Sequence, residues 1–246
     1  MENKRGKLIV IDGIDGSGKA TQTKLLVEKL RAEGYNVETL DFPQYYKNFF
    51  GSLIGRFLKG EFGSPTEVNP HIASVLYAAD RWESKEQIEG WLNEGKIVIL
   101  DRYVTANMGH QGGKIKDLKE REDFLKWLEK MEFDTFKIPT PDLNIFLHLK
   151  PEVAQLLIDK KNTRAYTQGS KRDAVESDIE YLKNSVSSFL SISRANPETW
   201  KTIFCTNKEE DNIVSIEEIQ NKILGIVKAF LIGKSFCNPP EQETLV

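Results

Sequence analysis

The sequence predicts an α/β fold in which a parallel sheet of about five strands lies between two layers of helices. Short apolar runs alternate along the chain with longer segments of helical periodicity, which is the order of β-α-β units. Three of the runs are almost continuously apolar, as is typical of parallel strands that are covered on both faces. A glycine-rich stretch directly follows the first run. We therefore expect a three-layer α/β/α arrangement.

The expected elements alternate regularly from one end of the chain to the other. The predicted strands occupy 7–12, 36–42, 96–101, 142–149 and 200–205, and the predicted helices occupy 18–33, 49–59, 70–93, 119–132, 151–160, 173–195 and 213–231. No repeat or linker divides this pattern. We therefore expect one domain over residues 1–232, followed by a loose tail over 233–246.

Composition narrows the classes of function. The 246 residues are 39% hydrophobic and 29% charged, as in soluble globular enzymes. The net charge is -3, which gives no reason to expect a nucleic-acid partner. No apolar run approaches the roughly 18 residues of a membrane helix. Two cysteines without metal-site spacing favour a reducing compartment, so we expect a cytoplasmic protein with no membrane partner.

The stretch "IDGIDGSGKATQ" (11–22) has the pattern of a phosphate-binding loop, G-x-x-x-x-G-K, between a strand and a helix. In such a loop backbone N–H groups surround phosphate oxygens, the helix N-terminus adds partial positive charge, and the lysine neutralises phosphate. Ala20 stands where a hydroxyl normally reaches Mg²⁺. The expected ATP-binding residues are Gly13, Asp15, Gly16, Ser17, Gly18, Lys19, Ala20 and Thr21.

Two further segments fit phosphoryl transfer. The strand 96–101 ends at Asp101, where a carboxylate can hold Mg²⁺ directly or through water, and the adjacent Arg102 suits a phosphoryl oxygen. Any buried strand can end in Asp by chance. Residues 160–172 carry five cations and no acid, and a solvated loop usually explains such a run. In a phosphotransferase it can instead form a basic lid, here about 159–173, that places an arginine on the transition state.

The predicted helix 70–93 offers an ambiguous pair. A stripe that includes Ile72 and Val75 is expected to be buried, and Tyr77 and Arg81 lie off it, side by side on the helix surface. The two side chains could receive a base and a phosphate. From spacing alone, an ordinary exposed contact between an aromatic ring and an arginine is the favoured interpretation.

Taken together, these motifs resemble those of the thymidylate kinases, a family of P-loop nucleoside monophosphate kinases. The resemblance covers roughly residues 7–230 and rests on the loop, "DFPQY" (41–45), "LYAADRWE" (76–83), "DRYVTANMGHQG" (101–112), "PDLNIFL" (141–147) and "RDAVESDIEYL" (172–182). It implies a P-loop NTPase-type fold and transfer of the γ-phosphoryl of ATP to dTMP, giving dTDP and ADP for dTTP synthesis. It also implies Mg²⁺ as cofactor and a homodimer.

The resemblance implies roles for individual residues. Asp15 matches the carboxylate that receives the sugar 3′-hydroxyl, Arg102 the arginine on the dTMP phosphate, and Arg164 the catalytic arginine of the lid. Tyr77 matches the ring that stacks on thymine, and Asn107 the residue that reads its edge. The implied catalytic residues are Lys19, Arg102, Arg164 and Asp15; the implied dTMP-binding residues are Asp15, Phe42, Pro43, Tyr45, Tyr77, Arg81, Arg102, Asn107 and His110; the implied metal-binding residues are Asp101 and Glu176.

Several departures leave alternatives open. Gln44, His110 and Val175 replace residues that related chains often carry, which puts strict selectivity for dTMP in question. Another nucleotide or deoxynucleoside kinase, acting on dUMP or a broader range, is the nearest alternative. The segment "TNKEE" (206–210) suggests a GTP-dependent switch, and Ala20 suggests a nucleotide-binding module without catalysis.

Overall fold

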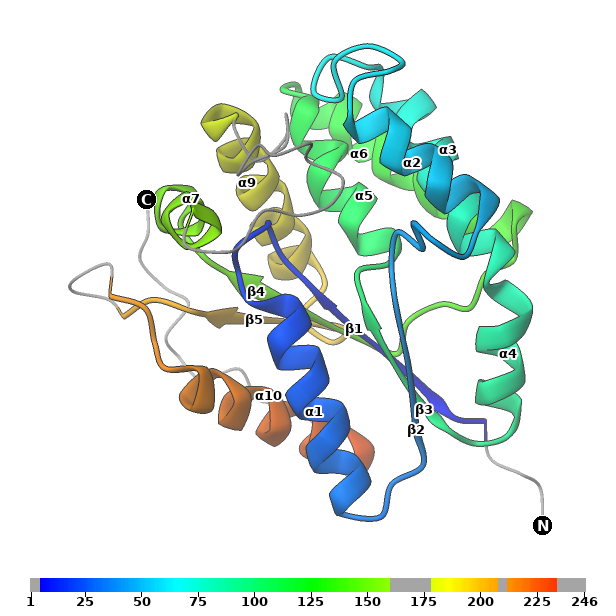
Figure 1. Ribbon diagram of the computed structural model, residues 1–246, viewed down its shortest axis with the longest axis vertical. Helices are drawn as coiled ribbons and strands as arrows, with labels where there is room; N and C mark the ends of the chain where they lie inside the picture. The colour runs from blue at the N-terminus through cyan, green and yellow to red at the C-terminus, as the bar shows by residue number, and fades with distance from the viewer. Residues whose placement is uncertain (1–4, 160–177, 208–211, 234–246) are drawn as a thin grey trace.

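The computed structural model describes residues 5–159, 178–207 and 212–233 (Figure 1). A five-stranded parallel sheet has the strand order β2-β3-β1-β4-β5, so the predicted sheet is confirmed. The strands are β1 (Lys7–Asp12), β2 (Val37–Asp41), β3 (Ile97–Asp101), β4 (Leu143–His148) and β5 (Trp200–Phe204). Each lies within one residue of its predicted bounds at either end.

Helices cover both faces of this sheet. In Figure 1 the pair α1 and α10 lies in front of the strands, and the pair α5 and α9 lies behind them. The helices are α1 (Lys19–Ala32), α2 (Phe49–Leu58), α3 (Pro70–Glu83), α4 (Lys85–Asn93), α5 (Val104–His110), α6 (Leu118–Glu129), α7 (Pro151–Asp159), α9 (Ile179–Ala195) and α10 (Ile216–Leu231), with a 3₁₀ turn η1 (Gly112–Lys114) and a π-helical turn η2 (Lys130–Thr135). The three-layer arrangement is therefore confirmed.

The core follows from the sequence of the central strands. Residues 8–11 of β1 and 98–100 of β3 are fully buried, because helices pack on both sides of them. Side-chain caps begin several helices: Asn69 precedes Pro70 at the start of α3, and Asp178 accepts a hydrogen bond from the Tyr181 amide at the start of α9.

The single helix expected over 70–93 is wrong: the chain forms α3 and α4, which are separated at Ser84. The Ser84 hydroxyl accepts a hydrogen bond from the Asn48 side chain at 3.0 Å, which ties the break to the loop before α2. The expected buried stripe is also wrong in part. Ile72 and Val75 are 67% and 42% exposed, because α3 turns a different face, with Ala73 and Ala78, toward its neighbours α2 and α5.

Helix α5 was not expected, because seven residues are too few to show helical periodicity. It lies against α9, and the Phe189 ring of α9 packs directly on the backbone of α5 at Gly109. A Cβ at this position would lie 2.1 Å from the Phe189 ring. The glycine therefore sets the distance between α5 and the helix behind it.

Several expectations concern residues outside the described ranges. They are the lid over 160–173 with Arg164, the metal residue Glu176, Val175, most of "TNKEE" and nearly all of the tail over 233–246. Within the described ranges, no helix combines the length and apolar character that crossing a membrane requires.

Candidate active site

Three parallel strands end in aspartates at one edge of the sheet. Asp12 closes β1, Asp41 closes β2 and Asp101 closes β3. Asp41 and Asp101 are register partners, and Ile11 pairs with Asp101 on the other side. Ligands of open α/β sheets bind outside the carboxyl ends of the strands, so this edge is the expected place for a site.

The glycine-rich loop between β1 and α1 needs its glycines. Gly16 and Gly18 have φ of 84° and 88°, a region that side chains other than glycine rarely adopt. A Cβ on Gly16 would also lie 2.6 Å from the carbonyl oxygen of Ala154 in α7. The loop therefore passes close to α7 and delivers the N-terminus of α1, with its unsatisfied N–H groups, to the cavity described below.

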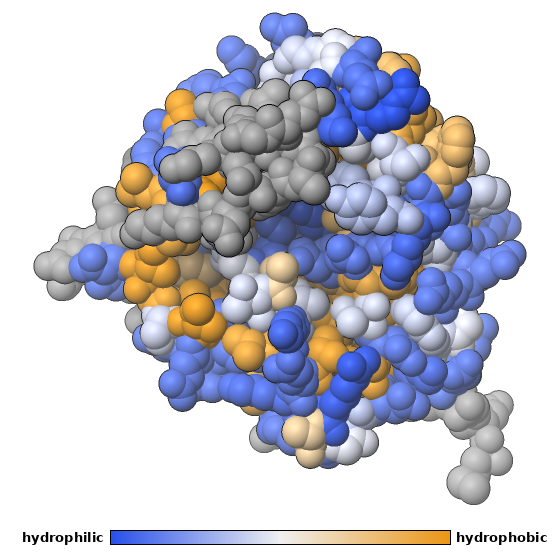
Figure 2. Space-filling view, in the orientation of Figure 1, coloured by the Kyte–Doolittle hydropathy of each residue, from blue (hydrophilic) through white to orange (hydrophobic). Residues whose placement is uncertain are grey.

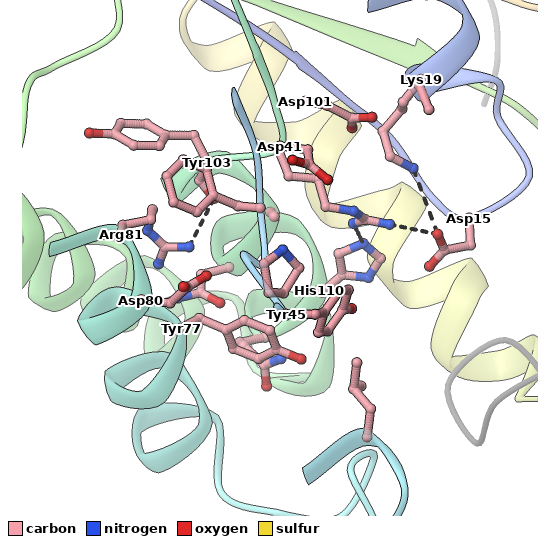
Figure 3. A pocket seen from close by; sticks show the side chains of 18 of the residues that line it. Asp15, Lys19, Asp41, Tyr45, Tyr77, Asp80, Arg81, Asp101, Tyr103 and His110 are labelled. Atoms are coloured by element: carbon pink, nitrogen blue, oxygen red, sulfur yellow. Dashed lines mark hydrogen bonds and ion pairs between the residues drawn. The ribbon is translucent and has the colours of Figure 1, made fainter. Parts of the chain in front are cut away.

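Lys19 begins α1 and folds back over the loop. Its Nζ donates to the carbonyl oxygen of Ile14 at 2.9 Å and lies 3.9 Å from Asp15 Oδ1 (Figure 3). Burial, together with the nearby Arg102 guanidinium, lowers the pKa of Lys19 to about 8. The ammonium is thus held in a water-poor place where an anion would be attracted strongly.

Arg102 lies between two acceptors at the centre of this edge. Its Nη2 donates to Asp15 Oδ1 at 2.8 Å, and its Nη1 lies 3.0 Å from His110 Nε2. Burial disfavours the guanidinium charge, but the carboxylates of Asp15, Asp12 and Asp101 outweigh it and raise the pKa of Arg102. The backbone of Arg102 has a φ of 69°, in the left-handed region, which is uncommon for a residue with a Cβ.

His110 accepts the Arg102 hydrogen bond as a neutral imidazole. Burial, and then the Arg102 charge, lower the pKa of His110 to about 3. The ring is stacked on Tyr181 and meets Phe189 edge-on, with ring centroids 5.9 Å and 5.6 Å apart. Because it stays uncharged at neutral pH, His110 adds no second cation beside Arg102.

The buried Asp12 and the half-buried Asp101 complete the set of charged residues at this edge. Asp12 accepts from the Gly13 amide at 2.8 Å and from the Thr105 hydroxyl at 2.7 Å, which fixes the start of the loop. Burial raises the pKa of Asp101 to about 6, although Lys19 and Arg102 act in the opposite direction. A carboxyl with this pKa is mostly ionised at pH 7 and gains further from any cation that approaches it.

A single cavity of about 290 Å³ connects the loop with an aromatic region. Figure 2 shows the surface hollowed close to the N-terminus of α1. Among the described residues the cavity includes every predicted acceptor-site residue. They are Asp15, Phe42, Pro43, Tyr45, Tyr77, Arg81, Arg102, Asn107 and His110, joined by Lys19 and Asp101.

The aromatic end of the cavity is shaped by contacts between distant segments. Phe42 packs on Tyr103 with ring centroids 5.9 Å apart, and Tyr77 meets Phe57 edge-on at 6.3 Å. The Asn107 side-chain N–H donates to the carbonyl oxygen of Ser74 at 3.2 Å. This hydrogen bond fixes the orientation of the Asn107 side-chain amide. The walls of this end are therefore flat rings with a buried amide beside them.

Arg81 does not form the exposed pair with Tyr77 that its spacing favours. It is only 2% exposed and pairs with Glu132, which is fully buried. Arg81 Nε donates to Glu132 Oε2 at 2.9 Å, and Nη2 donates to Oε1. The sequence prediction failed because the partner lies 51 residues away, in a turn with no regular periodicity.

Some residues of the site were missed. Asp41 lines the cavity beside Asp101, and its position at a strand end would have indicated it. Asp80 also lines the cavity. Its carboxylate accepts hydrogen bonds from the backbone N–H of Gln44 at 3.0 Å and from the side chain of Asn48 at 2.9 Å. Asp80 therefore joins α3 to the loop before α2. Neither this link nor the Glu132 pair has a signal in local sequence.

Comparison with known proteins bears on this site. The sequence model of the thymidylate kinase family matches residues 11–216 of this chain. The human thymidylate kinase is 34% identical over 151 residues, which are 61% of this chain and 64% of that protein. The thymidylate kinase of Schizosaccharomyces pombe is 31% identical over 74% of this chain and 77% of its own length, and a probable thymidylate kinase of Pyrococcus abyssi is 31% identical over 93% and 99%.

The solved structures agree on the fold. A thymidylate kinase structure from Candida albicans superposes with a TM-score of 0.69 over 95% of this chain and 96% of that one, at 24% sequence identity. The family match over residues 11–216 contains every residue that lines the cavity. On these grounds the chain belongs to the thymidylate kinase family.

Proposed function

We propose that this protein transfers the γ-phosphoryl group of ATP to dTMP, giving dTDP and ADP, as a step of dTTP synthesis. One observation carries the proposal beyond family membership. The same cavity is lined by two cations at one end, the buried Lys19 and the half-buried Arg102, and by aromatic rings at the other. A nucleoside monophosphate has this distribution, with a charged phosphate at one end and a flat base at the other.

The phosphate loop is the donor side. Residues 13–21 with the N-terminus of α1 would hold the ATP phosphates through backbone N–H groups, and Lys19 would neutralise the charge that develops during transfer. Ala20 supplies no hydroxyl at the position where a metal ligand is usual. Lys19 is already buried at this loop, 2.9 Å from the carbonyl oxygen of Ile14.

Mg²⁺ would be held at the strand ends rather than by the loop. Asp101 is the register partner of Asp41, and both residues line the cavity, so a cation bound there would lie between two carboxylates and favour their ionised forms. Mg²⁺ usually takes only one or two protein carboxylates and keeps several waters, so this donor set fits it. When bound, the ion would neutralise and orient the phosphates of ATP.

Asp15 and Arg102 would bind the acceptor. Arg102 would hold the dTMP phosphate, and Asp15, which pairs with it at 2.8 Å, would accept the sugar 3′-hydroxyl. An oxygen of the acceptor phosphate attacks the γ-phosphorus in line as the bond to the β-bridging oxygen breaks, and ADP leaves with that oxygen. The acceptor is already anionic, so positioning and charge neutralisation are sufficient and no general base is assigned.

The base would lie in the aromatic end. Tyr77 would stack on thymine, Phe42 and Pro43 would form the wall with Tyr45 close by, and Asn107 would read the base edge. A ring against a base is a stabilising contact of general use in nucleotide recognition. Arg164 of the predicted lid and Glu176 remain proposed contributors on sequence grounds alone.

We also propose a homodimer that forms through α3. Ile72, Val75 and Trp82 lie on one side of this helix and are 67%, 42% and 53% exposed. A contiguous apolar stripe on a helix is typical of a surface that packs on another protein. Sedimentation velocity should show Ile72→Asp as a monomer and the wild type as a dimer. Leu156→Asp, at an exposed apolar position on α7, is the matched control; a wild-type monomer would refute the dimer.

The organisation proposed for the chain is one kinase domain over 1–232 with a short tail, working in the cytoplasm. Cys205 is a buried free thiol, which is compatible with a reducing compartment.

The deciding experiment is ADP release with a panel of acceptors. With ATP as donor, turnover should be fastest with dTMP, slower with dUMP, and far slower with dCMP and thymidine. GTP in place of ATP tests the switch hypothesis. Faster phosphorylation of thymidine than of dTMP would contradict the role given to Arg102, and no turnover with any acceptor would favour a binding module.

A further inference from the structure

The turn η2 carries a carboxylate into the interior at the base end of the cavity. It continues α6 with π-helical geometry: the Phe136 amide donates to the carbonyl oxygen of Met131, five residues back, at 3.0 Å. Glu132 in this turn is fully buried, whereas Asp134 is exposed. Single π-turns within α-helices occur often at functional sites, and this one turns one acid inward.

Glu132 holds the guanidinium of Arg81 in one orientation. Its two oxygens accept from Nε at 2.9 Å and from Nη2, and Arg81 Nη1 donates to the backbone carbonyl of Tyr103 at 3.3 Å (Figure 3 shows the Tyr103 contact). Burial disfavours the Arg81 charge, but Glu132 outweighs burial and raises the pKa of Arg81. Arg81 is therefore a fixed cation in the cavity wall.

A buried ion pair of this kind is weak ground for a stabilising role. Apolar residues of the same volume are often as stable or more stable in such a place, so the pair calls for another explanation. Arg81 lines the cavity with Tyr77 and Asn107. Its neighbours in the described part of the chain engage three of the five guanidinium N–H groups, and one N–H remains on each terminal nitrogen.

The remaining N–H groups can select among bases. A guanidinium donates hydrogen bonds and accepts none, so it can meet a carbonyl oxygen but not an amino group. Thymine and uracil carry a carbonyl at C4, and cytosine carries an amino group there. An arginine that is held rigidly would therefore discriminate between these bases more strongly than one that can turn away.

We propose that Glu132 is a positioning residue that fixes Arg81 at the base end of the cavity and thereby makes the acceptor site prefer pyrimidines with a C4 carbonyl. This inference rests on the proposed function, because it concerns the acceptor of that reaction. Glu132 does not line the cavity and acts only through Arg81.

The first test is Glu132→Gln, compared with Asp134→Asn, which removes an exposed carboxylate from the same turn. Loss of a charge-assisted hydrogen bond should raise KM for dTMP about tenfold while kcat stays within about threefold. The kcat/KM preference for dTMP over dCMP should fall about tenfold, because the glutamine amide cannot accept from both arginine nitrogens. Asp134→Asn should match the wild type in all three quantities.

A double-mutant cycle separates positioning from general packing. In an Arg81→Gln background, Glu132→Gln should cause no further change in KM or in base preference, since its only route of action is gone. Additive effects of the two substitutions would overturn the inference. Where Glu132→Gln fails to fold, Glu132→Asp keeps the charge with a shorter side chain, and it should shift KM and base preference in the same direction at a near wild-type melting temperature.

The outcomes distinguish this inference from the proposed function. Absence of both dTMP turnover and calorimetric dTMP binding in the wild type would overturn both. Wild-type turnover with dTMP, together with unchanged KM and base preference in the Glu132 variants, would overturn the inference alone. Failure of both Glu132 variants to fold would also overturn it, in favour of a purely structural ion pair.

Discussion

The two ends of the cavity are built in different ways. At the phosphate end, Lys19, Asp15 and Arg102 lie on a short loop and at a strand end, and their charges face one another within 4 Å. At the base end, side chains from α3, α5 and the turn η2 meet through contacts between segments far apart in sequence. The phosphate end is held by charge and local backbone geometry, and the base end by packing across the fold.

The rate of phosphoryl transfer and the selectivity for the base should therefore depend on different ends of the cavity. A phosphate is common to all the monophosphate acceptors, so changes at the charged end should reduce turnover with every base. A change at the aromatic end should alter the ranking of bases and leave the chemical step almost intact.

Lys19→Met should reduce kcat about a thousandfold, because removal of a preorganised cation from a dry site weakens stabilisation of the developing charge. ADP release measures it. Lys24→Met, at a lysine on the same helix whose side chain is 77% exposed, should retain wild-type turnover. If Lys19→Met turned over at the wild-type rate, Lys19 would have no role at the phosphate end.

Arg102→Met should lower kcat/KM about a hundredfold through loss of a charge-assisted contact to the acceptor phosphate. The loss should be similar for dTMP, dUMP and dCMP, since all three carry the same phosphate. Circular dichroism should check the fold of the variant. A loss confined to one base would show that the two ends are not separable in the way described.

Alkaline pH should lower kcat/KM, by about tenfold at pH 9 relative to pH 7. The active form of Lys19 is the ammonium, and its lowered pKa of about 8 means that the proton is lost as pH rises through that value. Below pH 7 nearly all Lys19 side chains carry the proton. The pH profile of kcat/KM reports the free enzyme, and Lys19→Arg should lack this alkaline decline because arginine stays protonated.

Tyr77→Leu should raise KM for dTMP about fivefold with little change in kcat, because leucine keeps bulk but loses the stacking surface. Tyr46→Leu, at an aromatic residue that is 84% exposed, is a matched control and should change neither constant. A large fall in kcat for Tyr77→Leu would mean that the base end also positions the reacting phosphate.

The same contrast explains what could be predicted from sequence. The five strands were located to within one residue at either end, because buried parallel strands appear as apolar runs. The loop with Lys19 is contiguous, and Asp101 follows an apolar strand, so both were identified directly. The Arg81–Glu132 pair was not, since it joins an α-helix to a π-turn 51 residues away.

Local patterns also failed where neighbours decide burial. Ile72 and Val75 have helical spacing, but the fold turns them outward and buries alanines instead. At the break, Ser84 accepts a hydrogen bond from Asn48, a residue that no window of α3 contains. Helix α5 is too short for a periodic signal, although it supplies Asn107 and His110 to the cavity.

The left-handed backbone at Arg102 has a consequence for protein engineering. Residues with a Cβ are strained at a φ of 69°, and glycine or asparagine would suit this backbone better. A redesign programme that optimises stability alone would therefore tend to replace Arg102. It would remove the central cation of the cavity, so this position should be excluded from any such design.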